Sequence, residues 1–159
     1  EGGYGERRRE CAEAASAVGV SALADAALGD VDRLDDATLR RRARHVVTET
    51  ARVEQAVAAL AGRDWPRFGR LLSQSHVSLR DDFEVSCPEL DVAVDATMGA
   101  GALGARMTGG GFGGSAIALV ESSRAEAVAD ACRAAFADHG FEPPEVFPVE
   151  PSDGAGRLD

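Results

Sequence analysis

The residues best suited to phosphate chemistry form an unbroken loop of five glycines and one aromatic residue. This loop consists of Gly109, Gly110, Gly111, Phe112, Gly113 and Gly114. Glycine adopts positive φ angles at little steric cost, and consecutive backbone N–H groups in such a loop form a concave nest for phosphate oxygens. A tight turn between two strands would need the same glycines for steric reasons alone. The residues themselves leave both interpretations open.

The context of this glycine loop excludes three common nucleotide-binding motifs. A dinucleotide-binding loop leads directly into a helix, whereas residues 116–120 are strand-like. The glycine loop of protein kinases and the Walker A loop both depend on a lysine. The sequence contains no lysine, because all seventeen of its basic residues are arginine.

A histidine and two aspartates that are close in sequence have the composition of an acid–base site. His76, Asp81 and Asp82 lie within seven residues of one another, and such side chains can exchange protons with a reacting group. Structural roles at helix ends, including an ion pair with Arg80, are the favoured interpretation. Their function is left open.

A second group of candidates lies on a long helix expected further upstream. Its arginines Arg40, Arg41, Arg42 and Arg44 are interpreted as a solvated face that nearby carboxylates balance. His45, on the same helix, is expected at the surface or at a helix cap. None of these residues is assigned to a functional site.

Composition and charge exclude several classes of function. The net charge of −10 argues against nucleic acid as a partner, because binding to phosphate backbones requires a basic face. No apolar run is long enough to span a membrane, and the first residues do not have the pattern of a secretory signal. The cysteines are odd in number and form no C-x-x-C pair, so buried thiols in a reducing cytoplasm are expected; they are Cys11, Cys87 and Cys132.

Apolar spacing predicts that helices come first in the chain. Helices are expected over residues 6–17, 21–28 and 37–60, the last with an N-cap at Asp35 or Asp36. One stripe on the long helix is expected to face the core; it contains Leu39, Ala43, Val46, Val47, Val53, Val57 and Leu60. Asp64 should cap the next helix. Residues 75–86 are expected to mix a helix end with a loop, and another helix should start near Pro88.

Strands are expected only in the last third of the chain. Residues 105–108 and 116–120 are predicted as strands on either side of the glycine loop, and residues 145–149 as a final strand. Between them, Ser123 and Glu126 have the spacing of a capping box for a helix that extends to about residue 138. This order predicts a single α+β domain over residues 1–159, a small antiparallel sheet with helices packed on it.

Several blocks of residues together resemble the galactokinases, sugar kinases of the GHMP family. Residues 106–114 resemble a signature motif of that family, and residues 75–90 are similar to another of its segments almost letter for letter. Residues 44–53 are similar to its long helix. Tyr4 with the arginines that follow resembles the segment where the two halves of the family's members meet, and residues 151–155 also fit. The resemblance extends over nearly the whole chain.

This resemblance implies a GHMP kinase C-terminal domain from an enzyme that phosphorylates the anomeric hydroxyl of D-galactose with ATP. In that family the N-terminal domain of the same chain supplies the catalytic base, the Mg²⁺ ligands and most contacts to ATP. None of those motifs is present in residues 1–159, so this chain is expected to be a fragment that is inactive alone. A non-catalytic galactose sensor and a kinase for a related sugar remain alternatives.

Two features of this chain match functional positions of the family. Tyr4 matches a tyrosine that contacts a galactose hydroxyl, a role that suits a phenol with one donor and acceptor group. The loop Gly109–Gly114 matches a motif beside the nucleotide, where it is expected to support the site more than to bind directly. Neither a membrane nor a nucleic acid is expected as a partner.

Overall fold

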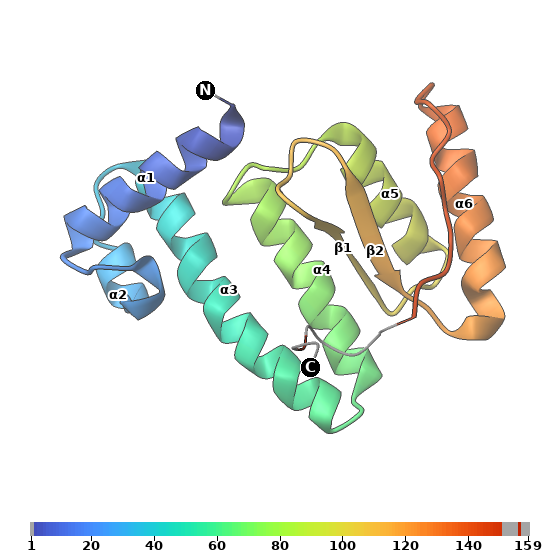
Figure 1. The fold of residues 1–159 in the computed structure, drawn as a ribbon, viewed down its shortest axis with the longest axis horizontal. Coiled ribbons are helices and arrows are strands. Elements are labelled where there is room, and N and C mark those ends of the chain that lie inside the picture. Colours follow the sequence, from blue (N-terminus) through green and yellow to red (C-terminus); the bar gives the residue numbers. More distant parts are fainter. Residues whose placement is uncertain (1, 151–155, 157–159) are drawn as a thin grey trace.

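The computed structural model describes residues 2–150 and 156, and it confirms the α+β class. Most of the fold is helical (Figure 1). The longer helices are α1 (Gly3–Val18), α3 (Ala37–Ala61), α4 (Trp65–Asp81), α5 (Pro88–Gly99) and α6 (Ala125–Asp138), and α2 (Leu28–Val31) is a single turn. None of the helices in the described part of the chain is long and apolar enough to cross a membrane.

The sheet consists of the two antiparallel strands β1 (Gly104–Thr108) and β2 (Ser115–Leu119). Thr108 pairs with Ser115 at the end of the ladder, so the glycine loop is the connection between these strands, as predicted. β1 packs on α4, and Gly69 of α4 and Gly104 of β1 allow this close approach because a Cβ on either would overlap the other segment's backbone.

The predicted starts of the helices are mostly correct. The carboxylate of Asp36 accepts hydrogen bonds from the backbone N–H groups of Thr38 and Leu39, which caps α3. Asp64 caps α4 in the same way through Arg67. These caps satisfy backbone donors that the first helical turn leaves without partners.

Among the described residues, two clusters of buried apolar side chains stand out. The first joins α1 and the segment before α3 to the first half of α3, and its members include Ala14, Val31 and Ala43. The second lies under the sheet and includes Leu79 and Met107.

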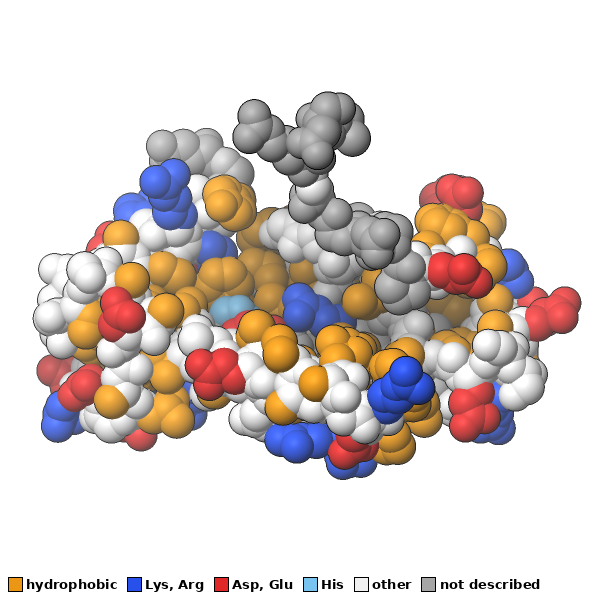
Figure 2. All heavy atoms as spheres, turned by 60° about the horizontal axis from the view of Figure 1, so that its bottom comes forward, with side chains coloured by type: hydrophobic (Ala, Val, Ile, Leu, Met, Phe, Trp, Pro, Cys, Tyr) orange, Lys and Arg blue, Asp and Glu red, His pale blue; other side chains and the backbone are white. Residues whose placement is uncertain are grey.

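The predicted stripe on α3 is wrong in its second half. Val53 and Val57 remain 57% and 62% exposed, and Leu60 is also exposed. Figure 2 brings the lower end of Figure 1 forward, and hydrophobic side chains are visible on the surface there. The three-and-four spacing therefore marks an apolar face of the helix without showing that this chain covers it.

Three short-range predictions are wrong. Residues 21–28 form no continuous helix but a 3-10 turn (Leu23–Asp25) followed by α2. The capping box is not formed, because a 3-10 turn over Ser122–Arg124 precedes α6 and no side chain caps that helix. Residues 145–149 form no strand; Pro148 lacks the N–H that a strand ladder requires.

Candidate functional site

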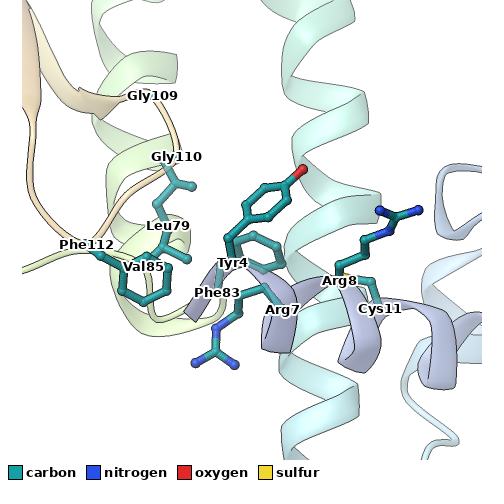
Figure 3. Close-up of a pocket in the computed structure, with 10 residues that line it drawn as sticks. All are labelled: Tyr4, Arg7, Arg8, Cys11, Leu79, Phe83, Val85, Gly109, Gly110 and Phe112. Carbon is teal, nitrogen blue, oxygen red and sulfur yellow. The ribbon is translucent and has the colours of Figure 1, made fainter. Parts of the chain in front are cut away.

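The pocket with the clearest chemistry lies where α1, the end of α4 and the glycine loop meet (Figure 3). Its volume is about 270 Å³. Three segments far apart in sequence line it: Tyr4, Arg7, Arg8 and Cys11 on α1, Leu79, Phe83 and Val85 at and after the end of α4, and Gly109, Gly110 and Phe112 in the loop. The sequence-predicted residues Tyr4, Gly109, Gly110 and Phe112 thus lie at one site, although Gly111, Gly113 and Gly114 do not line it.

Tyr4 is held in the first turn of α1 and is 70% exposed. Figure 3 shows its hydroxyl directed away from the axis of the helix. An exposed phenol that contributes little to packing is free to bond to a ligand in the pocket.

The glycine loop has the backbone conformation that its composition predicts. The angle φ is positive at Gly109 (85°), Gly111 (85°), Gly113 (118°) and Gly114 (105°), and also at Phe112 (60°). Phenylalanine in this region costs about 1–2 kcal/mol relative to ordinary backbone. The loop therefore holds a strained conformation that its neighbours must fix.

Contacts with two other segments fix the loop. The backbone N–H of Phe112 donates to the carbonyl of Val85 at 2.7 Å, and Gly111 packs so closely on Val85 that a Cβ would overlap it. The ring of Phe112 lies on Gly3, where a Cβ would overlap the ring atoms. The loop thus contacts both the segment after α4 and the start of α1.

The three residues with the composition of an acid–base site do not converge. His76 is buried, and its Nδ1 accepts the backbone N–H of Met107 at 3.3 Å. Its Nε2 lies 3.3 Å from a carboxylate oxygen of Asp91, without the geometry of a hydrogen bond. Burial lowers the pKa of His76, although Asp91 acts in the opposite direction. Asp81 is exposed and pairs with Arg80 at 2.7 Å, as expected.

The expectation for His45 is wrong, because this residue is buried. Its Nδ1 lies 3.0 Å from the hydroxyl of Ser78, which donates to Asp82 at 2.9 Å. Since the Ser78 hydrogen points to Asp82, Nδ1 of His45 must carry a hydrogen and donate. This direction is opposite to that in a catalytic site, where a nucleophilic serine donates its hydroxyl hydrogen to histidine. The hydrogen bonds of His45, Ser78 and Asp82 therefore hold α3 against α4. Burial lowers the pKa of His45 to about 4.

The interpretation of the arginine run is also wrong at one position. Arg42 is 2% exposed, while Arg44 lies at the surface. The Arg42 guanidinium donates to Glu10, to Glu84 and to the carbonyl of Asp82. These partners come from two other segments, so the spacing of residues along α3 gave no sign of them.

The cysteines are free and only partly fit the expectation. Cys132 is buried, whereas Cys11 and Cys87 are partly exposed, and Cys11 lines the pocket. Burial raises the pKa of the Cys11 thiol, so this sulfur is poorly suited to nucleophilic chemistry.

Comparison with known proteins assigns the fold. The family model described as GHMP kinases C terminal matches residues 56–138, just over half of the chain. The chain belongs to this family. The matched range contains the last six residues of α3, the whole sheet, the glycine loop and α6, but not Tyr4.

Matches to galactokinases extend over the remaining residues. Galactokinase of Streptomyces coelicolor is 53% identical over 99% of this chain, and that of Mycobacterium tuberculosis is 45% identical over 98%. Galactokinase of Homo sapiens is 50% identical over 77%. These alignments cover only 42%, 44% and 32% of the relatives, so the chain spans less than half of their length.

A solved structure is similar in three dimensions. A crystal structure of Lactococcus lactis galactokinase complexed with galactose has a TM-score of 0.85 and 38% identity to this chain. The match covers 90% of this chain and 39% of that one. At this identity, both the fold and its relation to galactokinases are shown.

Proposed function

We propose that this chain is the C-terminal part of an ATP-dependent galactokinase that phosphorylates the anomeric hydroxyl of D-galactose. The observation that supports this most is that Tyr4 and the glycine loop, far apart in sequence, line one pocket. The likeness of nearly the whole chain to galactokinases adds to it. In the reaction, the hydroxyl oxygen bonds to the γ-phosphorus of ATP as the bond to ADP breaks, and a base accepts the hydroxyl proton.

Within this site, we assign Tyr4 to the sugar side and the glycine loop to the nucleotide side. The Tyr4 hydroxyl can donate one hydrogen bond to a sugar hydroxyl and accept another. The N–H of Phe112 is already bonded to Val85, so this donor does not serve a phosphate. The loop therefore acts chiefly through its shape, with its other N–H groups as the donors that a nest offers to an anion.

We propose that the remaining catalytic groups reside in an N-terminal domain of the same chain. We also propose that the protein acts in the cytoplasm. Among residues 2–150 and 156, no group of three or more histidine, cysteine, aspartate or glutamate side chains is placed to hold a metal ion. The pocket is lined by arginines and apolar groups, with no carboxylate. We therefore assign the Mg²⁺ ligands and the catalytic base to that domain, and ATP to the boundary between the two.

The test compares this chain alone with a joined protein, in which the part of Streptomyces coelicolor galactokinase that precedes its matched region is placed before residue 1. ADP release that depends on galactose is measured for both. We expect turnover by the joined protein and none by the chain alone, because phosphoryl transfer requires the base and the metal to be positioned.

Other results would contradict this proposal in distinct ways. Turnover by the chain alone would place the base within these residues and make Asp81 and Asp82 the first candidates. A joined protein that binds galactose without turnover would mean that these residues do not complete a catalytic site with a galactokinase N-terminal part, and it would favour the sensor.

A further inference from the structure

We propose that Arg42 is a positioning residue that fixes the separation between Tyr4 and the glycine loop. This inference rests on the proposed function, in which these two features are the sugar and nucleotide sides of one site. Arg42 lines no part of the pocket. It acts through the segments that carry the pocket residues.

The guanidinium of Arg42 binds three groups in three directions. Its Nε donates to Glu10 at 2.8 Å, its Nη2 donates to Glu84 at 2.6 Å, and its Nη1 donates to the carbonyl of Asp82 at 2.5 Å. A planar guanidinium can hold such partners at fixed angles, whereas a lysine ammonium is a single point of charge. One buried side chain on α3 therefore ties α1 to the segment that follows α4.

On one side, this network reaches Tyr4 through α1. Glu10 lies six residues after Tyr4 on the same helix. Between them, Arg7 lines the pocket and also donates to the carboxylate of Glu10. The bond from Arg42 to Glu10 therefore fixes the rotation of α1 and, with it, the direction of the Tyr4 side chain.

On the other side, the network reaches the glycine loop through residues 82–85. Arg42 holds Asp82 and Glu84, and the next residue, Val85, accepts the N–H of Phe112 at 2.7 Å. The ring of Phe112 then returns to α1 at Gly3. The contacts therefore lead from α1 through Arg42 and the loop back to α1, and two of the residues along this path, Val85 and Phe112, also line the pocket.

The charges in this network persist over the ordinary pH range. Hydrogen bonds from Arg42 lower the pKa of Glu84. Burial raises the pKa of Glu10, but the hydrogen bonds from Arg42 and Arg7 outweigh it and the net pKa is lowered. Both carboxylates stay ionised, so loss of Arg42 alone would leave two negative charges without their main partner. A test must separate that loss of stability from a loss of positioning.

The kinetic test uses the joined protein with three variants. Arg42→Met removes the guanidinium, and the triple variant Arg42→Met, Glu10→Gln, Glu84→Gln also removes the two carboxylate charges, which would otherwise keep only Arg7 and Arg41 as partners. Arg44→Met is the matched control, because Arg44 lies two residues away on α3 and forms an exposed pair with Asp32.

We expect the triple variant to recover part of the Tm that Arg42→Met loses, because Glu10 and Glu84 no longer carry charges that lack Arg42, although Arg7 and Arg41 also lose their carboxylate partners. Its kcat/KM for galactose should still be lower by about 10²-fold, with most of the change in KM, since a displacement of the order of 1 Å at a site has effects of that size. Arg44→Met should change neither quantity. A triple variant with the kcat/KM of the unsubstituted joined protein would overturn the inference, because charge balance alone would then explain the network.

A spectroscopic test observes the position of Tyr4 without catalysis. This test uses residues 1–159 alone, in which Tyr4 is the only tyrosine, so 3-fluorotyrosine gives a single ¹⁹F resonance. We expect the triple variant to shift or broaden this resonance and Arg44→Met to leave it unchanged. An unchanged resonance in the triple variant would overturn the inference. If the unsubstituted joined protein does not phosphorylate galactose, the proposed function fails, while this measurement still decides whether Arg42 positions Tyr4.

Discussion

The buried imidazole of His45 should make the stability of this protein depend on pH. Burial lowers its pKa from 6.5 to about 4, so at pH 5 it is neutral in the folded state and protonated in the unfolded state. The unfolded state then binds more protons, and the free energy of unfolding falls as the pH falls. The effect begins as the pH drops through 6.5 and is complete below about 4.

The size of this effect follows from the two pKa values. A pKa shift of one unit between the unfolded and folded states corresponds to about 1.4 kcal/mol of unfolding free energy. The shift of His45 from 6.5 to about 4 therefore amounts to roughly 3 kcal/mol. That is a large part of the stability of a domain of this size. The hydrogen bond to Ser78 does not change with protonation, because Nδ1 already carries a hydrogen; the added proton is on Nε2.

The substitution His45→Asn isolates this contribution, because its amide can still donate to Ser78. At pH 7 it should cost about 1 kcal/mol through loss of the ring stacked on Phe83, whose centroid lies 4.4 Å away. As the pH falls, the variant should lose less stability than the wild type, and the difference between them should shrink and then reverse. Urea unfolding, followed by the fluorescence of Trp65, the only tryptophan, measures this between about pH 7 and pH 4.5.

A constant stability difference over that range would refute the reasoning, because it would mean that His45 binds protons equally in both states. Burial also lowers the pKa of His76, but that residue is present in both proteins and cancels in the comparison. His139→Asn, on the exposed end of α6, controls for the loss of an imidazole.

Further predictions concern the site, the packing under the sheet and the apolar face of α3. Tyr4→Phe in the joined protein should raise the KM for galactose about tenfold, the effect of one hydrogen bond, with an unchanged Tm because the side chain is exposed. Gly69→Ala would place a Cβ against the backbone of Leu103 and should lower the free energy of unfolding in urea by about 2–3 kcal/mol. The chain alone should self-associate in sedimentation velocity, and Val53→Ser with Val57→Ser should reduce this, because exposed apolar faces promote association.

The sequence predicted the long elements well because their signals repeat over many residues. α3 combines a regular apolar spacing with a capping carboxylate at Asp36, and both indicate the same helix. The two strands and the turn between them follow from a run of glycines between short apolar segments. In each case several independent patterns agree.

Predictions that depended on one local pattern were less reliable. Ser123 and Glu126 have the spacing of a capping box, but the chain turns in a 3-10 conformation over Ser122–Arg124 and uses no side-chain cap. Residues 145–149 contain two valines and a phenylalanine, residue types that favour strands, but a strand also needs a partner edge and free N–H groups. A pattern of four or five residues cannot supply either condition.

The buried positions of His45 and Arg42 could not be predicted from residue type. Charged residues are usually exposed unless they are paired, and the carboxylates that pair with Arg42 are 32 and 42 residues away in sequence. His45 likewise bonds to Ser78, 33 residues further on. Only the packing of α1, α3 and α4 brings these groups together. The structure is therefore needed to show both that Arg42 and His45 are buried and which groups they bond to.

The candidate residues Tyr4 and Gly109–Gly114 followed from the resemblance, but their arrangement depends on contacts that only the fold makes. A glycine at position 112 would adopt a φ of 60° without strain, whereas phenylalanine bears a cost there. What phenylalanine adds is a ring that contacts Gly3, one residue before Tyr4. That contact joins the two features that the resemblance indicated separately. The strained Phe112 is therefore the residue through which the glycine loop packs on the start of α1.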